Sequence, residues 1–206
     1  MKPQADFFHE NRLWSQGKTV VAGIDEVGRG AWAGPVVAAA VVFPPFFDPP
    51  FALFDSKLLK PKQREVLSEK ISSVAKVGIG SVEVPIINKS GIVNATQDAF
   101  KKAVSSLKAQ TDFYLIDAFY ISDWDRENQL PIKKGDRVCS SIAAASVVAK
   151  VYRDRIMRQL STRYPKYGFE RHKGYGTKFH QEAIARHKFS NIHRTSFQLT
   201  PYLNAG

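Results

Sequence analysis

The sequence predicts an α/β fold in which a mixed five-stranded sheet is flanked by helices on both faces. Short apolar runs of strand length dominate the first part of the chain, and segments with apolar residues at helix spacing alternate with the later runs. A chain of 206 residues can bury a full core as one domain with C-terminal elaborations. We therefore expect residues 1–206 to form a single domain.

The first two strands are expected at residues 18–24 and 36–43. The first is rich in β-branched residues and leads into two acids, whereas the second is almost wholly apolar. Because a short connection joins them, they should lie antiparallel, and such apolar runs are typical of strands covered on both faces. A helix opened by Pro61 should follow, and then a third strand at 76–84 that Pro85 stops.

Helices and strands alternate in the second half of the chain. A helix capped by Asn88 or Ser90 should run to about Leu107, because its apolar residues recur at helix spacing. A fourth strand is expected at 112–117 and a short fifth strand at 130–133. A long helix is expected at about 138–162. A C-terminal helical extension should follow it and include a short helix at about 177–187.

The charge balance favours a polyanionic partner. Lys and Arg number 30 against 19 Asp and Glu, which gives a formal net charge of +11. Basic surfaces bind phosphates with release of counterions, although a positive charge can also simply keep molecules apart in solution. The single Cys139 cannot form an intramolecular disulfide, which favours the cytoplasm. No signal peptide and no membrane-spanning run is visible, so we expect no membrane association.

Acidic residues follow three of the apolar runs. Asp25 and Glu26 come after the first expected strand, Asp117 ends the fourth, and Asp136 follows the fifth. Strand ends in an α/β sheet can converge at one edge, and neighbouring carboxylates repel one another unless a cation lies between them. Oxygen ligands without a Cys/His cluster suit Mg²⁺ or Mn²⁺, and two such ions can promote phosphodiester hydrolysis.

Each acid also has an ordinary interpretation. Asp136 could be the N-cap of the following helix, and Asp117 could end its strand in a turn. Asp25 and Glu26 could form ion pairs with basic residues at the surface. The run Gly28-Arg29-Gly30 directly after the first two acids favours catalysis. Its glycines let the backbone approach a ligand, and its arginine presents a positive fork to phosphate.

Basic residues on the long C-terminal helix leave two interpretations open. Lys150, Arg153 and Arg155 are equally consistent with a solvated face and with contacts to phosphate. The histidines further along the chain show no metal-ligand spacing with a cysteine. A zinc site is therefore not expected.

Taken together, the motifs resemble the ribonuclease HII family, the type 2 ribonucleases H. The resemblance runs from Gly23 to about Phe197, and its strongest pieces, in chain order, are GIDEVGRGAWAGPVVAAAVV, DSKLLKPKQRE, LIDA, KGDRVCSSIAAASVVAKVYRDR and HKGYGT. It implies a ribonuclease H-like fold and a monomeric endonuclease that uses Mg²⁺ or Mn²⁺. The implied substrates are RNA/DNA hybrids and DNA containing single ribonucleotides, cut on the 5′ side of the ribonucleotide to leave 3′-hydroxyl and 5′-phosphate ends.

The resemblance also implies roles for particular residues. It implies that four acids bind the metal and perform catalysis: Asp25, Glu26, Asp117 and Asp136. The loop Gly28, Arg29 and Gly30 is implied to sense the ribose, and Tyr175 to stack near the sugar at the RNA-to-DNA junction. Three further residues are implied to contact the nucleic-acid backbone: Lys57, Asn94 and Lys150. The substrate-binding helices and loop are expected to begin at about residue 165.

The chain departs from the family pattern after the third acid. The family more often has glycine there, whereas this chain has Ala118, and the run that follows holds the further acids Asp123, Asp125 and Glu127. We take Asp117 as the third ligand because it ends a strand.

Two alternative functions are disfavoured by the sequence. Ribonuclease HIII shares the acids but lacks the arginine of the glycine loop and usually carries an extra N-terminal domain. Here Arg29 is present and Asp25 lies near the start of the sequence. A nucleic-acid-binding protein that has kept this fold without catalysis is disfavoured by the four intact acids.

Overall fold

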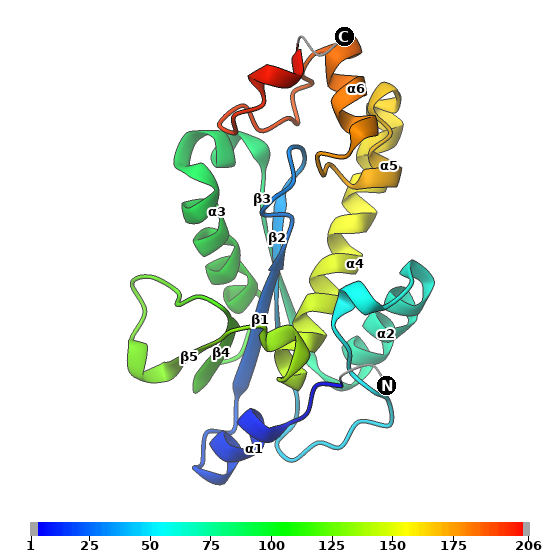
Figure 1. Ribbon diagram of the computed structural model, residues 1–206. Helices are drawn as coiled ribbons and strands as arrows, with labels where there is room; N and C mark the ends of the chain where they lie inside the picture. The colour runs from blue at the N-terminus through cyan, green and yellow to red at the C-terminus, as the bar shows by residue number, and fades with distance from the viewer. Residues whose placement is uncertain (1–3, 204–206) are drawn as a thin grey trace.

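One mixed sheet of five strands forms the centre of the molecule. The computed structural model describes residues 4–203. The strand order is β3-β2-β1-β4-β5, with β1 antiparallel to β2, β2 antiparallel to β3, and β4 parallel to both β1 and β5 (Figure 1). This confirms the mixed five-stranded sheet and the antiparallel first pair. The strands are β1 (Val21–Val27), β2 (Val36–Val42), β3 (Lys76–Val82), β4 (Phe113–Asp117) and β5 (Gln129–Ile132).

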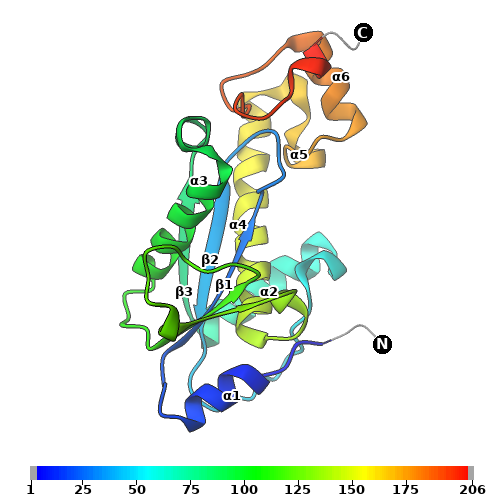
Figure 2. The ribbon, with the colours of Figure 1, turned by 60° about the vertical axis from the view of Figure 1, so that its left-hand side comes forward.

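Helices cover both faces of the sheet, as the sequence predicts. The long helix α4 packs on one face and α3 on the other, each against alternate side chains of β1 and β2, so that both strands are buried on two sides (Figures 1 and 2). None of the helices in residues 4–203 is long and apolar enough to cross a membrane. The helices are α1 (Phe8–Ser15), α2 (Pro61–Val74), α3 (Val84–Ser106), α4 (Ser140–Arg163), α5 (Phe169–His172) and α6 (Lys178–His187).

The first strand begins and ends later than the sequence predicts. Asp25 and Glu26 lie inside β1, opposite Ala39 and Ala38 of β2, instead of following the strand. The strand continues through the acids because the long apolar strand β2 offers it a partner at every position up to Val27. The two acids are therefore held by sheet hydrogen bonding and not by a loop.

Helix α3 begins at Val84, earlier than the expected cap at Asn88 or Ser90. Pro85 opens this helix instead of only stopping the strand before it, because the first turn of a helix does not need the N–H that proline lacks. Gly91, with φ of 79°, interrupts the helix. The side chain of Ser90 donates to a carbonyl of its own helix, so it does not act as the expected cap.

Helix α1, which the sequence analysis did not predict, is joined to the start of α4. Glu10 of α1 is fully buried, and its Oε1 accepts a hydrogen bond of 2.7 Å from the backbone N–H of Ser141 in the first turn of α4. A carboxylate at this position satisfies a free N–H and complements the helix dipole.

The C-terminal extension lies at the end of α4 that is far from Ser140. Helices α5 and α6 lie near the end of α4 that projects beyond the sheet, and the loop between β1 and β2 reaches the same region (Figures 1 and 2). Backbone hydrogen bonds join this loop to the extension, including Trp32 N–H to the carbonyl of Gly174 at 2.8 Å. The extension is thus in direct contact with the loop that follows the β1 acids.

Candidate active site

Three of the four predicted acids line one pocket of about 410 Å³. Asp25 and Glu26 come from β1, and Asp117 comes from the end of the neighbouring parallel strand β4. Since Ile24 pairs with Ile116 across these strands, the acids that follow the two residues are brought side by side. The pocket is lined by Asp25, Glu26, Val27, Ser56, Lys57, Asp117, Ser146, Lys150 and Tyr175.

Burial and mutual repulsion disfavour the ionised forms of these three carboxylates unless a positive charge lies beside them. Burial raises the pKa of Asp25 well above its usual value, and the charges of Glu26 and Asp117 raise it further. The pKa of Glu26 is also raised by burial, although Arg29 acts against this. Oε2 of Glu26 is buried and has no hydrogen-bond partner among the described residues. An unsatisfied carboxylate oxygen beside two further acids fits a hard divalent cation.

Asp136 approaches this group from the side. Oδ1 of Asp117 accepts a 2.8 Å hydrogen bond from the N–H of Gly135, which brings the Asp136 turn next to Asp117. Oδ2 of Asp136 lies 3.3 Å from Nζ of Lys57. Across residues 4–203, no three His, Cys, Asp or Glu side chains are already grouped closely enough to hold a metal ion. Asp25, Glu26 and Asp117 therefore border a shared pocket, with the Asp136 turn beside Asp117, and the acids do not form a closed ligand shell.

The ordinary interpretation of Asp136 is wrong. Helix α4 begins at Ser140, with Cys139 in the cap position, so Asp136 is not the N-cap of that helix. Asp136 is instead buried in a separate turn, where Lys57 is its ionic partner.

The alternative third acids lie outside the pocket. Asp123 forms a 3.0 Å ion pair with Lys101, and Asp125 accepts from the N–H of Glu127 in a short turn. Ala118, at the position where the family resemblance favours glycine, has φ of 61°. The left-handed conformation costs a non-glycine residue about 1–2 kcal/mol, which gives a physical reason for glycine at this position.

The two glycines in the loop after the acids have different surroundings. Gly28 has φ of 91°, and a Cβ there would lie 2.2 Å from Nε of Arg153. A Cβ on Gly30 would meet no atom within 4 Å. Between them, Nη1 of Arg29 lies 3.5 Å from Oε1 of Glu26, and its guanidinium lies 4.4 Å from the ring centre of Phe119. The protein fills the space beside Gly28 but leaves that beside Gly30 open.

Tyr175 lies in a second glycine-containing loop that packs closely on the first. A Cβ on Gly174 would lie 2.4 Å from the carbonyl oxygen of Ala33, and one on Gly176 would lie 2.2 Å from the Trp32 ring. The backbones of the two loops can approach this closely because both positions lack side chains. Tyr175 is thereby held at the same pocket as the acids.

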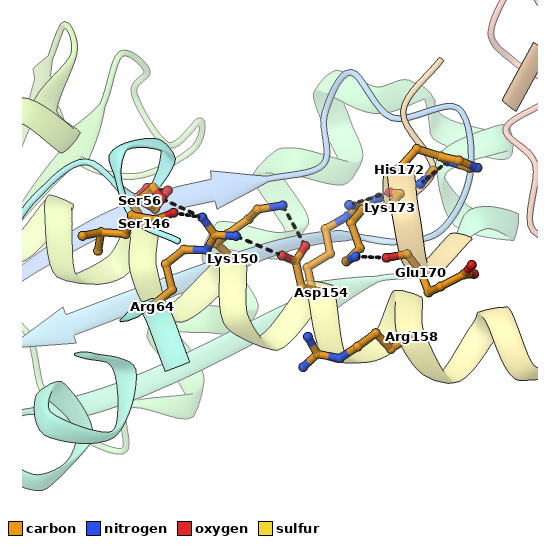
Figure 3. A network of polar contacts seen from close by, with 12 residues as sticks. Ser56, Arg64, Ser146, Lys150, Asp154, Arg158, Glu170, His172 and Lys173 are labelled. Carbon is orange, nitrogen blue, oxygen red and sulfur yellow. Dashed lines mark hydrogen bonds and ion pairs between the residues drawn. The ribbon is translucent and has the colours of Figure 1, made fainter. Parts of the chain in front are cut away.

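The three predicted backbone-contact residues have different surroundings. Burial lowers the pKa of Lys57, but its attraction to Asp136 and other acids outweighs this and raises the pKa above its usual value. Nζ of Lys150 donates to Oδ1 of Asp154 at 2.7 Å (Figure 3). Both lysines line the pocket. Asn94 does not: it is exposed on α3, and its amide donates to the carbonyl of Ser90.

Several residues of the site were missed by sequence reasoning. Ser146 of α4 hydrogen-bonds to Asp25, which acts against the rise in the pKa of that acid. The hydroxyl of Ser146 also lies 3.0 Å from that of Ser56. Arg153 and Arg194 are fully buried and hold the glycine loop through its carbonyls. The only signal for Ser146 was its place in a helix of small residues, which shows close packing but not a polar role.

A chain of buried histidines supports the Tyr175 loop. Nδ1 of His180 lies 3.1 Å from the carbonyl oxygen of Tyr175, and Nε2 of His180 lies 3.0 Å from Nε2 of His193. The N–H of Ser190 donates to Nδ1 of His193 at 2.9 Å. Burial, followed by the charges of neighbouring histidines, lowers the pKa of His180 to about 3. Burial also lowers the pKa of His193 to about 4.

Comparison with known proteins places this chain in a family. The sequence model of ribonuclease HII matches residues 22–200. Ribonuclease HII of Herpetosiphon aurantiacus is 45% identical, with 92% of this chain and 93% of the relative covered. Ribonuclease HII of Acetivibrio thermocellus is 48% identical, with 92% of this chain and 73% of the relative covered.

Solved structures of related enzymes share the fold. Ribonuclease H2 from Pyrococcus horikoshii OT3 is similar with a TM-score of 0.73 at 24% identity, over 88% of this chain and 95% of that chain. Bst ribonuclease HIII in complex with Mn²⁺ is similar with a TM-score of 0.62 at 22% identity, over 90% of this chain and 69% of that chain. These similarities confirm the predicted ribonuclease H-like fold, and the match of the family model and the curated relatives shows that the chain belongs to the ribonuclease HII family.

Proposed function

We propose that this enzyme cuts on the 5′ side of single ribonucleotides embedded in duplex DNA, in addition to cutting RNA/DNA hybrids, and leaves 3′-hydroxyl and 5′-phosphate ends. As a member of the ribonuclease HII family it is a metal-dependent endoribonuclease that acts on RNA/DNA hybrids. One observation carries the finer proposal: Tyr175 lines the same pocket as Asp25, Glu26 and Asp117. A ring suited to stacking on a sugar then lies beside carboxylates suited to a metal.

The metal ligands in this proposal are Asp25, Glu26, Asp117 and Asp136. The unpartnered Oε2 of Glu26 and the mutual repulsion of the buried acids support a cation here. Mg²⁺ or Mn²⁺ bound there would supply an activated water and stabilise the leaving oxygen of the phosphodiester. The Mn²⁺ complex of Bst ribonuclease HIII supports Mn²⁺ as one suitable ion. Asp136 would exchange Lys57 for the metal as its ionic partner.

The remaining residues would orient the substrate. Backbone groups of residues 28–30 would recognise the 2′-hydroxyl, which both donates and accepts a hydrogen bond, and the open space at Gly30 supports a close approach of the sugar. Lys57 and Lys150 would contact phosphates on either side of the scissile bond. Asn94, exposed on α3 outside the pocket, would contact the backbone of the duplex further away.

We also propose that residues 1–206 act as one catalytic domain and as a monomer in the cytoplasm. The hydrogen bonds from the N–H groups of Trp32 and Ala33 to the carbonyl of Gly174 support a single unit, because they join the catalytic loop to the C-terminal extension. The buried, unpaired thiol of Cys139 suits a reducing compartment.

The proposal is tested with a labelled DNA duplex that contains one ribonucleotide. We expect cleavage only when Mg²⁺ or Mn²⁺ is present, with the upstream product ending in a 3′-hydroxyl directly before the ribonucleotide. A matched all-DNA duplex should remain intact, and an RNA/DNA hybrid should be cut as the activity shared by the family. Cleavage of the hybrid without cleavage at the single ribonucleotide would contradict the finer proposal.

A further inference from the structure

Arg153 of α4 is buried in the interior, whereas the nearby Tyr152 and Arg155 on the same helix are exposed. The side chain of Arg153 is 0% exposed, and its three guanidinium nitrogens each donate to a backbone carbonyl. Nε donates to Pro35 at 2.9 Å, Nη2 to Ala33 at 3.1 Å, and Nη1 to Lys173 at 2.9 Å. No carboxylate within residues 4–203 forms an ion pair with it. The sequence-based alternatives, a solvated face or a phosphate contact, are therefore both wrong for this residue.

A charge buried in this way is costly. Burial lowers the pKa of Arg153 below its usual value, which reflects the loss of hydration by the guanidinium. The planar fork of arginine can satisfy three carbonyls in different directions, whereas the ammonium of lysine on its flexible stem presents no such fork. The three carbonyls belong to two different loops, so the cost is offset by contacts that join them.

The two loops are those expected to read the substrate. Pro35 and Ala33 end the loop that begins with Gly28-Arg29-Gly30, and Lys173 lies two residues before Tyr175. The guanidinium of Arg153 also lies 5.4 Å from the centre of the Tyr175 ring. At Gly28, the side chain of Arg153 fills the space that a Cβ would need. One side chain thus contacts both ends of the first loop and both the backbone and the ring of the second.

We propose that Arg153 is a positioning residue that fixes the Tyr175 ring relative to the glycine loop, and so sets the gap into which the ribose fits. This inference rests on the proposed function of the two loops. Arg194 also holds the loop that begins with Gly28-Arg29-Gly30, through the carbonyls of Arg29 and Gly34, but its hydrogen bonds reach no described residue of the Tyr175 loop. Arg153 is therefore the buried arginine that links the two.

The test compares Arg153→Lys with Arg155→Lys, a matched control that makes the same change on an exposed residue of the same helix. On a duplex with one embedded ribonucleotide, Arg153→Lys should lower kcat about 10–100-fold, the scale expected when a reacting group is misplaced by about 1 Å. Its affinity for an all-DNA duplex and the salt dependence of that affinity should match those of the wild type, because no phosphate contact is lost. Arg155→Lys should cleave like the wild type.

Coupling to Tyr175 separates positioning from general support of the fold. In a Tyr175→Ala background, Arg153→Lys should cost much less activity than in the wild type, because the ring that it positions is absent. The inference would be overturned if Arg153→Lys reduced cleavage by the same factor in both backgrounds, or if it reduced duplex affinity in parallel with cleavage. Arg153→Gln provides a second variant that keeps a planar donor, and a failure of both variants to fold would assign Arg153 to stability alone and also overturn it.

Failure of the proposed function gives a different result. If the wild type does not cleave at the embedded ribonucleotide, both the proposed function and this inference are contradicted. If the wild type cuts it and Arg153→Lys cuts it equally fast, only the inference about Arg153 falls.

Discussion

Nζ of Lys150 lies 2.7 Å from Oδ1 of Asp154, one turn further along α4. Burial lowers the pKa of Lys150, and the bond to Asp154 acts against this change. Asp154 lies in turn 3.7 Å from the guanidinium of Arg64, so that it joins α4 to α2 (Figure 3). Lys150 is thus held at the wall of the pocket by a buried carboxylate and does not belong to a freely solvated face.

We expect Lys150→Ala to weaken binding to a duplex and to reduce its dependence on salt. Removal of one phosphate contact lowers the slope of log affinity against log salt concentration by about 0.9. Titrations of an all-DNA duplex at several salt concentrations measure this slope. Lys102→Ala, on α3 across the sheet, is the control and should leave the slope unchanged. An unchanged slope for Lys150→Ala would show that Lys150 makes no phosphate contact.

The buried Glu10 should stabilise the start of α4. Glu10→Ala removes the acceptor of the Ser141 N–H and leaves that donor buried, which should lower the free energy of unfolding by about 1–3 kcal/mol. Denaturant unfolding of the variant and the wild type measures the difference. Arg12→Ala, on the exposed side of α1, should change stability little. If both variants were equally stable, the contact would contribute no net stability.

The sequence predicted the parts of the site that depend on neighbouring strands. Asp25 and Asp117 each occur next to an apolar run, and parallel pairing of β1 with β4 brings such residues together. The role of Glu10 was not predictable in this way, because its partner lies 131 residues further along the chain. Arg153 was also misjudged, since a basic residue on a helix suggests solvent or phosphate, and only the folded loops supply the carbonyls that satisfy it.

The fold was predicted most closely where hydrophobic pattern alone decides it. The apolar run of β2 was recognised as a strand buried on both faces, whereas the boundary at Val84 was not. There, Pro85 indicates the end of a strand, but it also lies in the first turn of α3. Local chemistry permits both readings, and the packing of α3 on the sheet selects one.

The histidine chain should make stability fall in acid. Because the N–H of Ser190 donates to Nδ1 of His193, the ring proton of His193 lies on Nε2 and is donated to Nε2 of His180, whose Nδ1–H then donates to Tyr175. Both rings are neutral in this arrangement, and a second proton on either ring replaces a required acceptor or adds an unsatisfied charge.

The direction of the pH effect follows from the lowered pKa values. The pKa of His180 in the folded protein is about 3 and that of His193 about 4, both below the ordinary histidine pKa of 6.5. Their contribution is therefore complete above pH 6.5 and is lost as the pH falls toward 4, by about 1.4 kcal/mol per pH unit for each histidine. Unfolding curves between pH 7 and 4 measure this loss.

The stability of His193→Gln should fall less steeply with pH, whereas that of His187→Gln, at an exposed position of α6, should fall as it does in the wild type. Equal slopes in all three proteins would contradict the assignment.

Gly30→Ala should separate substrate approach from folding. A methyl group at Gly30 meets no protein atom within 4 Å, so thermal stability should be unchanged, but the methyl would occupy space that the proposed ribose needs. We expect about tenfold or greater loss of cleavage at an embedded ribonucleotide, corresponding to about 1.4 kcal/mol of transition-state stabilisation. Gly28→Ala should instead lower stability, because its Cβ would overlap Arg153. Full activity in a stable Gly30→Ala variant would mean that the sugar does not approach this residue.

The central claim, that the pocket acids hold the metal that cleaves the strand, is tested most directly by Asp25→Asn. The measurement is single-turnover cleavage of a duplex with one embedded ribonucleotide in Mg²⁺ or Mn²⁺, together with binding of the same duplex. Asp123→Asn, which changes an exposed acid outside the pocket, is the matched control and should cleave normally. We predict that Asp25→Asn binds the duplex as tightly as the wild type but loses cleavage by about a hundredfold or more. Cleavage by Asp25→Asn at close to the wild-type rate would contradict the account.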